Sequence, residues 1–192
     1  MLIRQGVTIH NPLTQSQTVV LESDQETQGM GWLLEVTCQP NTKPDIAEHR
    51  HLTWTETFEI MSGIAHYSLD GKQQMLKAGE SFQVKPNQAH IHPWNAGDQP
   101  MVYRQRNLFD QANPAAVQDV LGVFATVADL ARQGKVNAEG LPKNPLQLAA
   151  TARTLGRYGG YDTRMPIAVQ KVLSATLGRL AELLGYRGVY PA

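Results

Sequence analysis

The spacing of apolar and polar residues changes near residue 110 and divides the chain into two parts. Before that point, short runs rich in β-branched and aromatic residues alternate with turn residues, as in GVTIHN, SQTVVLES, GWLLEVTCQ, TFEIMSG, IAHYSLDG, ESFQVKP and MVYRQRNL. Many short, evenly spaced strands are typical of a β-sandwich or β-barrel. Asp70-Gly71 lies between two such runs and predicts a two-residue hairpin turn.

After residue 110 the apolar residues recur at helical spacing and predict three helices. Asn113-Pro114 and Asn144-Pro145 each place an N-cap residue before a proline, which suits the first helical position. The third helix begins at Pro166, and its apolar stripe contains Val169, Val172, Leu173, Leu177, Leu180 and Leu184. We expect a β-barrel domain over residues 1–110 and a helical C-terminal extension over residues 111–192. The apolar stripes should pack on the barrel or on a partner subunit, and we expect a homodimer.

Charge and composition narrow the classes of partner. The 192 residues contain 17 Lys and Arg against 17 Asp and Glu. A neutral chain has no electrostatic reason to bind nucleic acid or an anionic membrane. We expect no membrane span, since no stretch approaches the ~20 apolar residues that one needs, and the first residues lack the apolar run of a signal peptide. We therefore expect a cytoplasmic protein that binds neither nucleic acid nor membrane.

The stretch EHRHLTWTETFEIMSG contains a candidate metal-binding pattern. His49 and His51 stand two residues apart, so on a strand they lie on one face, ~6.6 Å apart along the chain. Two imidazoles at that separation can converge on one ion. Glu56 shares its face with Phe58 and Ile60, and a buried carboxylate is costly unless it is paired or bound to a metal. The pattern therefore favours a ligand role for Glu56.

A third imidazole is expected from GESFQVKPNQAHIHPWN. His90 and His92 have the same strand parity, so both can point into one cavity, and the residues alone leave the choice open. Three imidazoles and one carboxylate suit a divalent transition metal such as Fe, Mn, Ni, Cu or Zn, whereas calcium and magnesium prefer oxygen ligands. The candidates for a pocket wall, or for contacts that orient the ligands, are His92, Trp54, Trp94, Phe58 and Tyr103.

These residues resemble the two motifs of the cupin superfamily. The first motif, HxH, then E and then G, is matched by His49, His51, Glu56 and Gly63. The second is matched by Gly79, Pro86, His90 and Asn95, with three departures: Pro86 falls one place late, Asn87 replaces a glycine, and one extra residue precedes Asn95. Asparagine tolerates the positive φ of that glycine. The resemblance implies a mainly β, jelly-roll barrel followed by three helices, with His49, His51, Glu56 and His90 as metal ligands.

The resemblance does not choose a reaction, because cupins include enzymes and binding proteins. The first hypothesis is a metal-dependent enzyme, of oxygenase or isomerase type, acting on a small organic substrate. In it, Glu56 serves as a ligand and as a candidate base. The alternative is a non-catalytic cupin that binds or senses a small molecule and holds a structural metal. A closed metal shell would favour the alternative.

Overall fold

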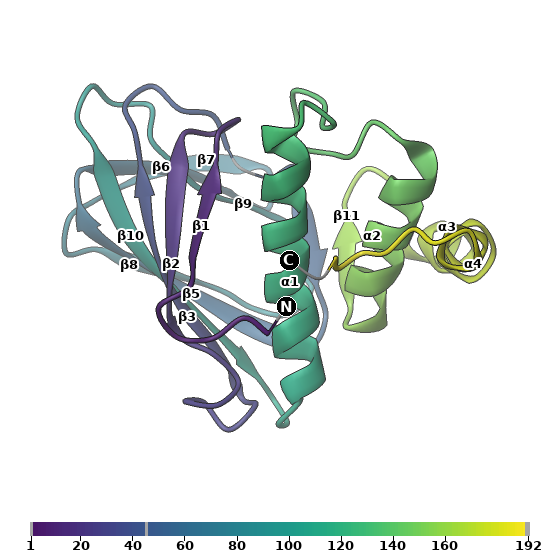
Figure 1. The fold of residues 1–192 in the computed structure, drawn as a ribbon. Helices are drawn as coiled ribbons and strands as arrows, with labels where there is room; N and C mark the ends of the chain where they lie inside the picture. The colour runs from purple at the N-terminus through teal and green to yellow at the C-terminus, as the bar shows by residue number, and fades with distance from the viewer. Residues whose placement is uncertain (1, 45, 191–192) are drawn as a thin grey trace.

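The fold is two β-sheets that pack face to face, with helices on one side. A computed structural model describes residues 2–44 and 46–190. The six-stranded sheet has the order β1-β2-β3-β10-β5-β8, and the five-stranded sheet has the order β11-β4-β9-β6-β7. Side chains of both sheets and of α1 form one hydrophobic core, which includes Trp32, Phe58, Ala65, Val117 and Leu121. The predicted mainly β barrel with C-terminal helices is thus confirmed (Figure 1).

The strands of the six-stranded sheet are β1 (Thr8–Asn11), β2 (Ser16–Glu22), β3 (Gly31–Cys38), β5 (Trp54–Ser62), β8 (Ser81–Val84) and β10 (Met101–Phe109). Those of the other sheet are β4 (His49–His51), β6 (Ile64–Leu69), β7 (Lys72–Lys77), β9 (His90–Trp94) and β11 (Gly160–Asp162). The helical segments are α1 (Pro114–Arg132), α2 (Pro145–Arg157), α3 (Ile167–Leu173), a π-helical turn (Ser174–Gly178) and α4 (Arg179–Leu183).

Turn residues begin and end these elements where their chemistry predicts. Asp70 and Gly71 have φ angles of 48° and 74°, and they join β6 to β7 as the predicted hairpin. Asn87 has a φ of 71°, so it does replace the glycine of the motif. Its N–H donates to the carbonyl of His51 at 2.7 Å, which links this turn to β4. The side chains of Asn113 and Asn144 accept N–H groups of the first turns of α1 and α2.

The helix α1 lies between the barrel and the other helices (Figure 1). Its buried side chains, among them Val117, Val120 and Leu121, join the core of the barrel. By length and composition, α1 is apolar enough to cross a membrane, although 44% of the relevant window is buried inside the protein. This corrects the expectation that no stretch of the chain is long and apolar enough to approach a membrane span. The composition-based reading missed it because alanine and glycine complete a window that is not uniformly aliphatic.

α3, the π-helical turn and α4 follow one another without a break and form the last helix. The predicted apolar stripe of this helix does not face the barrel. Of its predicted members, Val172 is 63% exposed, Leu180 is 48% exposed and Leu184 is 59% exposed. The residues of this helix that are buried are the small Gly178 and Ala181. Within the described residues, the stripe of α1 thus packs on the barrel, whereas the stripe of the last helix does not.

A close backbone approach between β3 and β10 supplies the first prediction. A Cβ at Gly31 would lie 1.8 Å from the carbonyl oxygen of Asn107, which is backbone and cannot rotate away. We expect Gly31→Ala to lower the free energy of unfolding by about 3 kcal/mol or more, measured by urea denaturation. Gly71→Ala is the matched control: its Cβ would meet nothing within 4 Å, so only the cost of a positive φ, about 1 kcal/mol, should be seen. Equal stability of the two variants would contradict this reading of the β3–β10 contact.

Candidate metal site

The carboxylate of Glu56 is held inside the barrel by its neighbours on β5 and β10. Side chains alternate along β5, so Glu56 shares the buried face with Trp54 and Phe58. One carboxylate oxygen, Oε1, accepts three hydrogen bonds: from Trp54 Nε1 at 3.2 Å, Gln105 Nε2 at 3.3 Å and Asn107 Nδ2 at 2.7 Å. The strand register places Asn107 opposite Glu56. Three donors on one oxygen fix the orientation of the carboxylate.

The other oxygen of Glu56, Oε2, faces three imidazoles. It lies 2.9 Å from His90 Nε2, 3.4 Å from His51 Nε2 and 3.5 Å from His92 Nε2. These three histidines are each no more than 2% exposed. The ring of His51 is also stacked on that of Trp54, with centroids 4.4 Å apart. Two of the predicted ligands, His51 and His90, and the alternative candidate His92 therefore face the same carboxylate oxygen.

His49 completes the cluster from the rim. It pairs with His90 across β4 and β9, and the two ring centroids are 4.2 Å apart. One ligand atom from each of His49, Glu56, His90 and His92 lies within 4.8 Å of the others. Donors that share one ion lie no more than ~4.4 Å apart, because metal–nitrogen and metal–oxygen bonds are ~2.0–2.2 Å long. The four atoms would therefore move slightly closer together around an ion.

Backbone carbonyls orient two of the imidazoles toward that shared point. Nδ1 of His49 lies 3.1 Å from the carbonyl oxygen of Ala47, and Nδ1 of His90 lies 3.1 Å from that of Gln88. A ring that donates from Nδ1 presents Nε2 as the lone-pair nitrogen, the arrangement of metal-binding histidines. Among the described residues, neither ring nitrogen of His51 has a partner with hydrogen-bond geometry, despite the 3.4 Å ion-pair contact with Glu56. A buried imidazole without a hydrogen-bond partner has a nitrogen lone pair available for a metal ion. The residues therefore fit the ion that the resemblance implies.

The electrostatics of the cluster favour an ionised Glu56 and a neutral His49. Burial alone raises the pKa of Glu56, but attraction to positive charge on His51 and His92, together with the hydrogen bond between His90 and Glu56, holds that pKa well below its usual value. Burial, together with repulsion from His90 and His92, holds the pKa of His49 well below its usual value. An ionised carboxylate and a neutral imidazole are the forms that bind a metal.

The C-terminal part of the chain reaches the strand that carries two of the histidines. β11 pairs antiparallel with β4, which places Asp162 opposite His49 and Gly160 opposite His51. β9 pairs with β4 at His49, so β11 lies on the other side of β4 in the sheet. The residues between 158 and 164 therefore belong to the barrel, although the sequence predicted only helices and their connections after residue 110.

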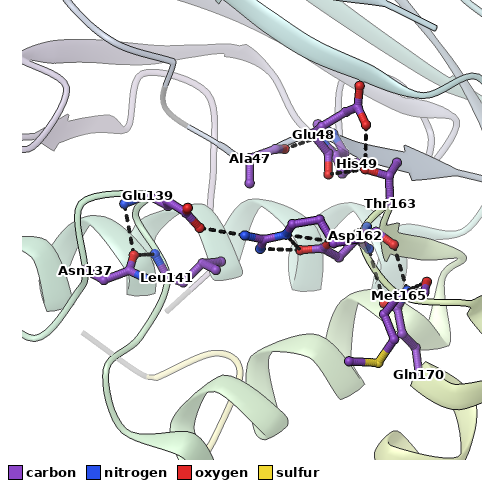
Figure 2. A network of polar contacts seen from close by, with 11 residues as sticks. Ala47, Glu48, His49, Asn137, Glu139, Leu141, Asp162, Thr163, Met165 and Gln170 are labelled. Carbon is purple, nitrogen blue, oxygen red and sulfur yellow. Dashed lines mark hydrogen bonds and ion pairs between the residues drawn. The ribbon is translucent and has the colours of Figure 1, made fainter. Parts of the chain in front are cut away.

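Polar side chains reinforce this contact beside the site (Figure 2). The hydroxyl of Thr163 donates to the carboxylate of Glu48 at 2.6 Å, and it lies 3.2 Å from the Glu48 carbonyl oxygen. The guanidinium of Arg164 bridges Asp162 and Glu139, with N–O distances of 2.6 Å to each. These contacts join the residue before His49 to the loops on either side of α2.

Of the predicted pocket residues, Phe58, Tyr103 and Trp54 lie at or next to the cluster, and Trp94 lies away from it. Phe58 lies beside His92, with ring centroids 5.2 Å apart, and Tyr103 is 6.0 Å from Phe58. Trp54 binds Glu56 and stacks on His51. Trp94 instead lies 5.9 Å from His66, and the structure does not place it in the cluster. Phe58, Tyr103 and Trp54 are buried, so these three form the apolar wall behind the donors.

Sequence reasoning missed two residues of this site, Gln105 and Asn107. Both are no more than 2% exposed and both donate to Glu56. The signal was present, because they share strand parity with Tyr103, whereas Arg104 and Arg106 have the opposite parity. The two arginines point outward and pair with Glu35 and Glu22. Two buried amides on one strand face are costly unless they have partners, and here Glu56 is that partner.

A jelly-roll barrel with a buried cluster of histidines around one glutamate defines the structural class. Residues 34–105 match the family model described as the Cupin domain, Cupin_2. This chain therefore contains a cupin domain, and the match confirms the resemblance seen in the motifs. No curated protein matches the chain.

Solved structures similar to this chain include a predicted oxalate decarboxylase from Thermotoga maritima. It is 17% identical, with a TM-score of 0.48, and the match covers 57% of this chain and 99% of that chain. An RmlC-like cupin from Shewanella frigidimarina is 15% identical, with a TM-score of 0.42 and coverages of 54% and 84%. A cupin-superfamily sugar phosphate isomerase from Silicibacter pomeroyi is 13% identical, with a TM-score of 0.44 and coverages of 55% and 69%.

The amide of Asn107 supplies the second prediction. Asn107→Leu removes the shortest hydrogen bond to Glu56 Oε1, which leaves the carboxylate less firmly oriented. We expect the affinity for a divalent transition metal to fall by about 10–100-fold, measured by competition with a chromogenic chelator. Arg104→Leu, on the outward face of the same strand, is the control and should leave the affinity within about twofold. A folded Asn107→Leu protein that binds metal as tightly as the parent would show that this amide does not orient a ligand.

Proposed function

We propose that this protein is a transition-metal-dependent cupin enzyme, of oxygenase or isomerase type, that acts on a small organic substrate. The observation that carries the proposal is that three Nε2 atoms, of His51, His90 and His92, converge on Oε2 of Glu56. A bound divalent ion of Fe, Mn, Ni, Cu or Zn would supply Lewis acidity and a binding point for substrate oxygens. Its ligands would come from His49, His51, Glu56, His90 and His92.

The chain's own residues would orient the substrate and handle its protons. Phe58 and Tyr103 offer an apolar wall next to His92, which suits the carbon skeleton of a small organic molecule. Glu56 is our candidate base. Its Oε2 is the atom that would take the proton, since Oε1 already accepts three hydrogen bonds.

A specific observation favours a second function, a non-catalytic cupin that binds or senses a small molecule. His51 lies 3.4 Å from Glu56, beside the group of His49, Glu56, His90 and His92 whose ligand atoms are within 4.8 Å of one another, so one imidazole more than the motifs require is at hand. Five protein donors on one ion would leave few positions for substrate, and a closed shell is typical of structural metal sites. The two functions therefore differ in whether His51 and His92 both bind the metal.

Metal content tests the shared part of both functions. Protein purified without chelator and reconstituted with each candidate metal should retain about one ion per chain by elemental analysis. Glu56→Gln and His90→Ala should each lose most of this metal. His66→Ala is the matched control, because His66 lies on β6 beside Trp94, outside the cluster. Failure of the parent protein to retain any transition metal would reject the metal site itself.

A spectroscopic experiment separates the enzyme from the structural alternative. In the cobalt-substituted protein, added azide should change the visible absorption bands if a coordination position is open to exogenous ligands. We expect such a change in the parent protein. Unchanged bands in the parent, together with a change in His51→Ala or His92→Ala, would instead show a closed shell and favour the non-catalytic cupin.

A further inference from the structure

The last helix presents a continuous aliphatic surface to solvent. Residues 167–183 are helical throughout, at the end of the molecule farthest from the barrel (Figure 1). Seven aliphatic side chains on one face are between 36% and 77% exposed. We call this face the outer stripe; it consists of Val169, Val172, Leu173, Leu177, Leu180, Leu183 and Leu184.

The opposite face of the same helix is made of small residues that fit closely against α2. Ala181 is fully buried, and a Cβ at Gly178 would lie 3.0 Å from Arg153 and 3.2 Å from the carbonyl oxygen of Ala149. Arg153 also bonds Glu182 at 2.9 Å and the carbonyl of Ser174 at 2.8 Å. The helix thus turns its small residues toward its own protein and its large aliphatic residues away. This is the reverse of a surface helix that covers a core.

The segment that follows the helix does not cover the outer stripe. It folds back over α1 and α2: the N–H of Tyr190 donates to Thr126 at 3.1 Å, and the hydroxyl of Tyr190 donates to Gln147 at 2.7 Å. Val189 packs so closely on Gly122 that a Cβ there would lie 2.6 Å from it. Within the described residues, no segment of the chain packs over the stripe.

The spacing along the stripe is that of a helix that packs on another helix. Val169, Leu173, Thr176, Leu180 and Leu183 follow one another at intervals of four, three, four and three residues, the a/d spacing of a helix–helix seam. The hydroxyl of Thr176 donates to the carbonyl of Val172 at 2.8 Å, so it needs no water and is compatible with burial.

The charges near this helix lie outside the stripe. Glu182 is bound to Arg153 on the inner side. By helical position, Lys171 and Arg179 fall beside the stripe rather than within it. The seam therefore brings no like charge against itself when it meets its own copy.

We propose that two copies of this chain associate through the outer stripe, so that the last helix and α2 of each form a four-helix interface about a twofold axis. A twofold contact requires a self-complementary surface, and an uncharged aliphatic seam meets that requirement. A standard interface buries about 800 Å² per partner, and the seven exposed aliphatic side chains of the stripe would form the apolar centre of such an interface. Leu148 on α2 and Met165 before α3 are also exposed apolar residues, at 36% and 39%.

Analytical ultracentrifugation of the full chain tests this interface. The parent protein should sediment as a dimer at micromolar concentration. Leu180→Glu places a carboxylate at the centre of the seam, and twofold symmetry places it there twice. We expect the dissociation constant to rise by about 100-fold or more. Ala175→Glu adds the same charge to the same helix on an exposed position outside the stripe, and it should sediment like the parent.

Circular dichroism and metal content distinguish a lost interface from a misfolded variant. Leu180 is already 48% exposed in the single chain, so circular dichroism and metal content of Leu180→Glu should match those of Ala175→Glu. A monomeric parent, or a dimer that Leu180→Glu leaves intact, overturns the proposal. If the monomeric parent instead binds anionic phospholipid vesicles and Leu180→Glu does not, a membrane is the occupant and the dimer is rejected.

Discussion

The carboxylate of Glu56 has two distinct sides, and the interior of this barrel is arranged around both. Its Oε1 is held by the indole of Trp54 and the amides of Gln105 and Asn107. Its Oε2 meets the imidazoles. A buried carboxylate without such partners would be costly. The two buried amides would be costly for the same reason without Glu56, so each half of the arrangement depends on the other.

The hydrogen bond between Asn107 and Glu56 depends on the register of the strands that carry them. Asn107 faces Glu56 only while β10 keeps its pairing with β5, and β10 pairs with β3 on its other edge. The carbonyl of Asn107 approaches Gly31 so closely that no side chain fits between them. The spacing of three strands therefore sets the position of one amide, and that amide sets the orientation of the central carboxylate.

The sequence predicted what depends on local periodicity and missed what depends on packing. Strand parity placed Glu56 and Phe58 on one buried face, and the motifs brought the histidines to one place. Gln105 and Asn107 escaped notice because neither belongs to a motif, although their parity carried the signal. β11 has three residues and pairs with a strand more than 100 residues earlier, so nothing in its own sequence indicates a strand. The choice between His90 and His92 stays a prediction, since both imidazoles reach Glu56.

The orientation of the last helix is a further property that periodicity cannot supply. A stripe of valine and leucine shows which face is apolar, but small residues on the opposite face decide which side packs closest to α2. Gly178 and Ala181 are the buried residues of this helix, and a Cβ at Gly178 would already lie 3.0 Å from Arg153. The helical extension is held by that contact, by β11 and by α1. Its large aliphatic residues are not needed for its own attachment, which leaves them for contact with another molecule.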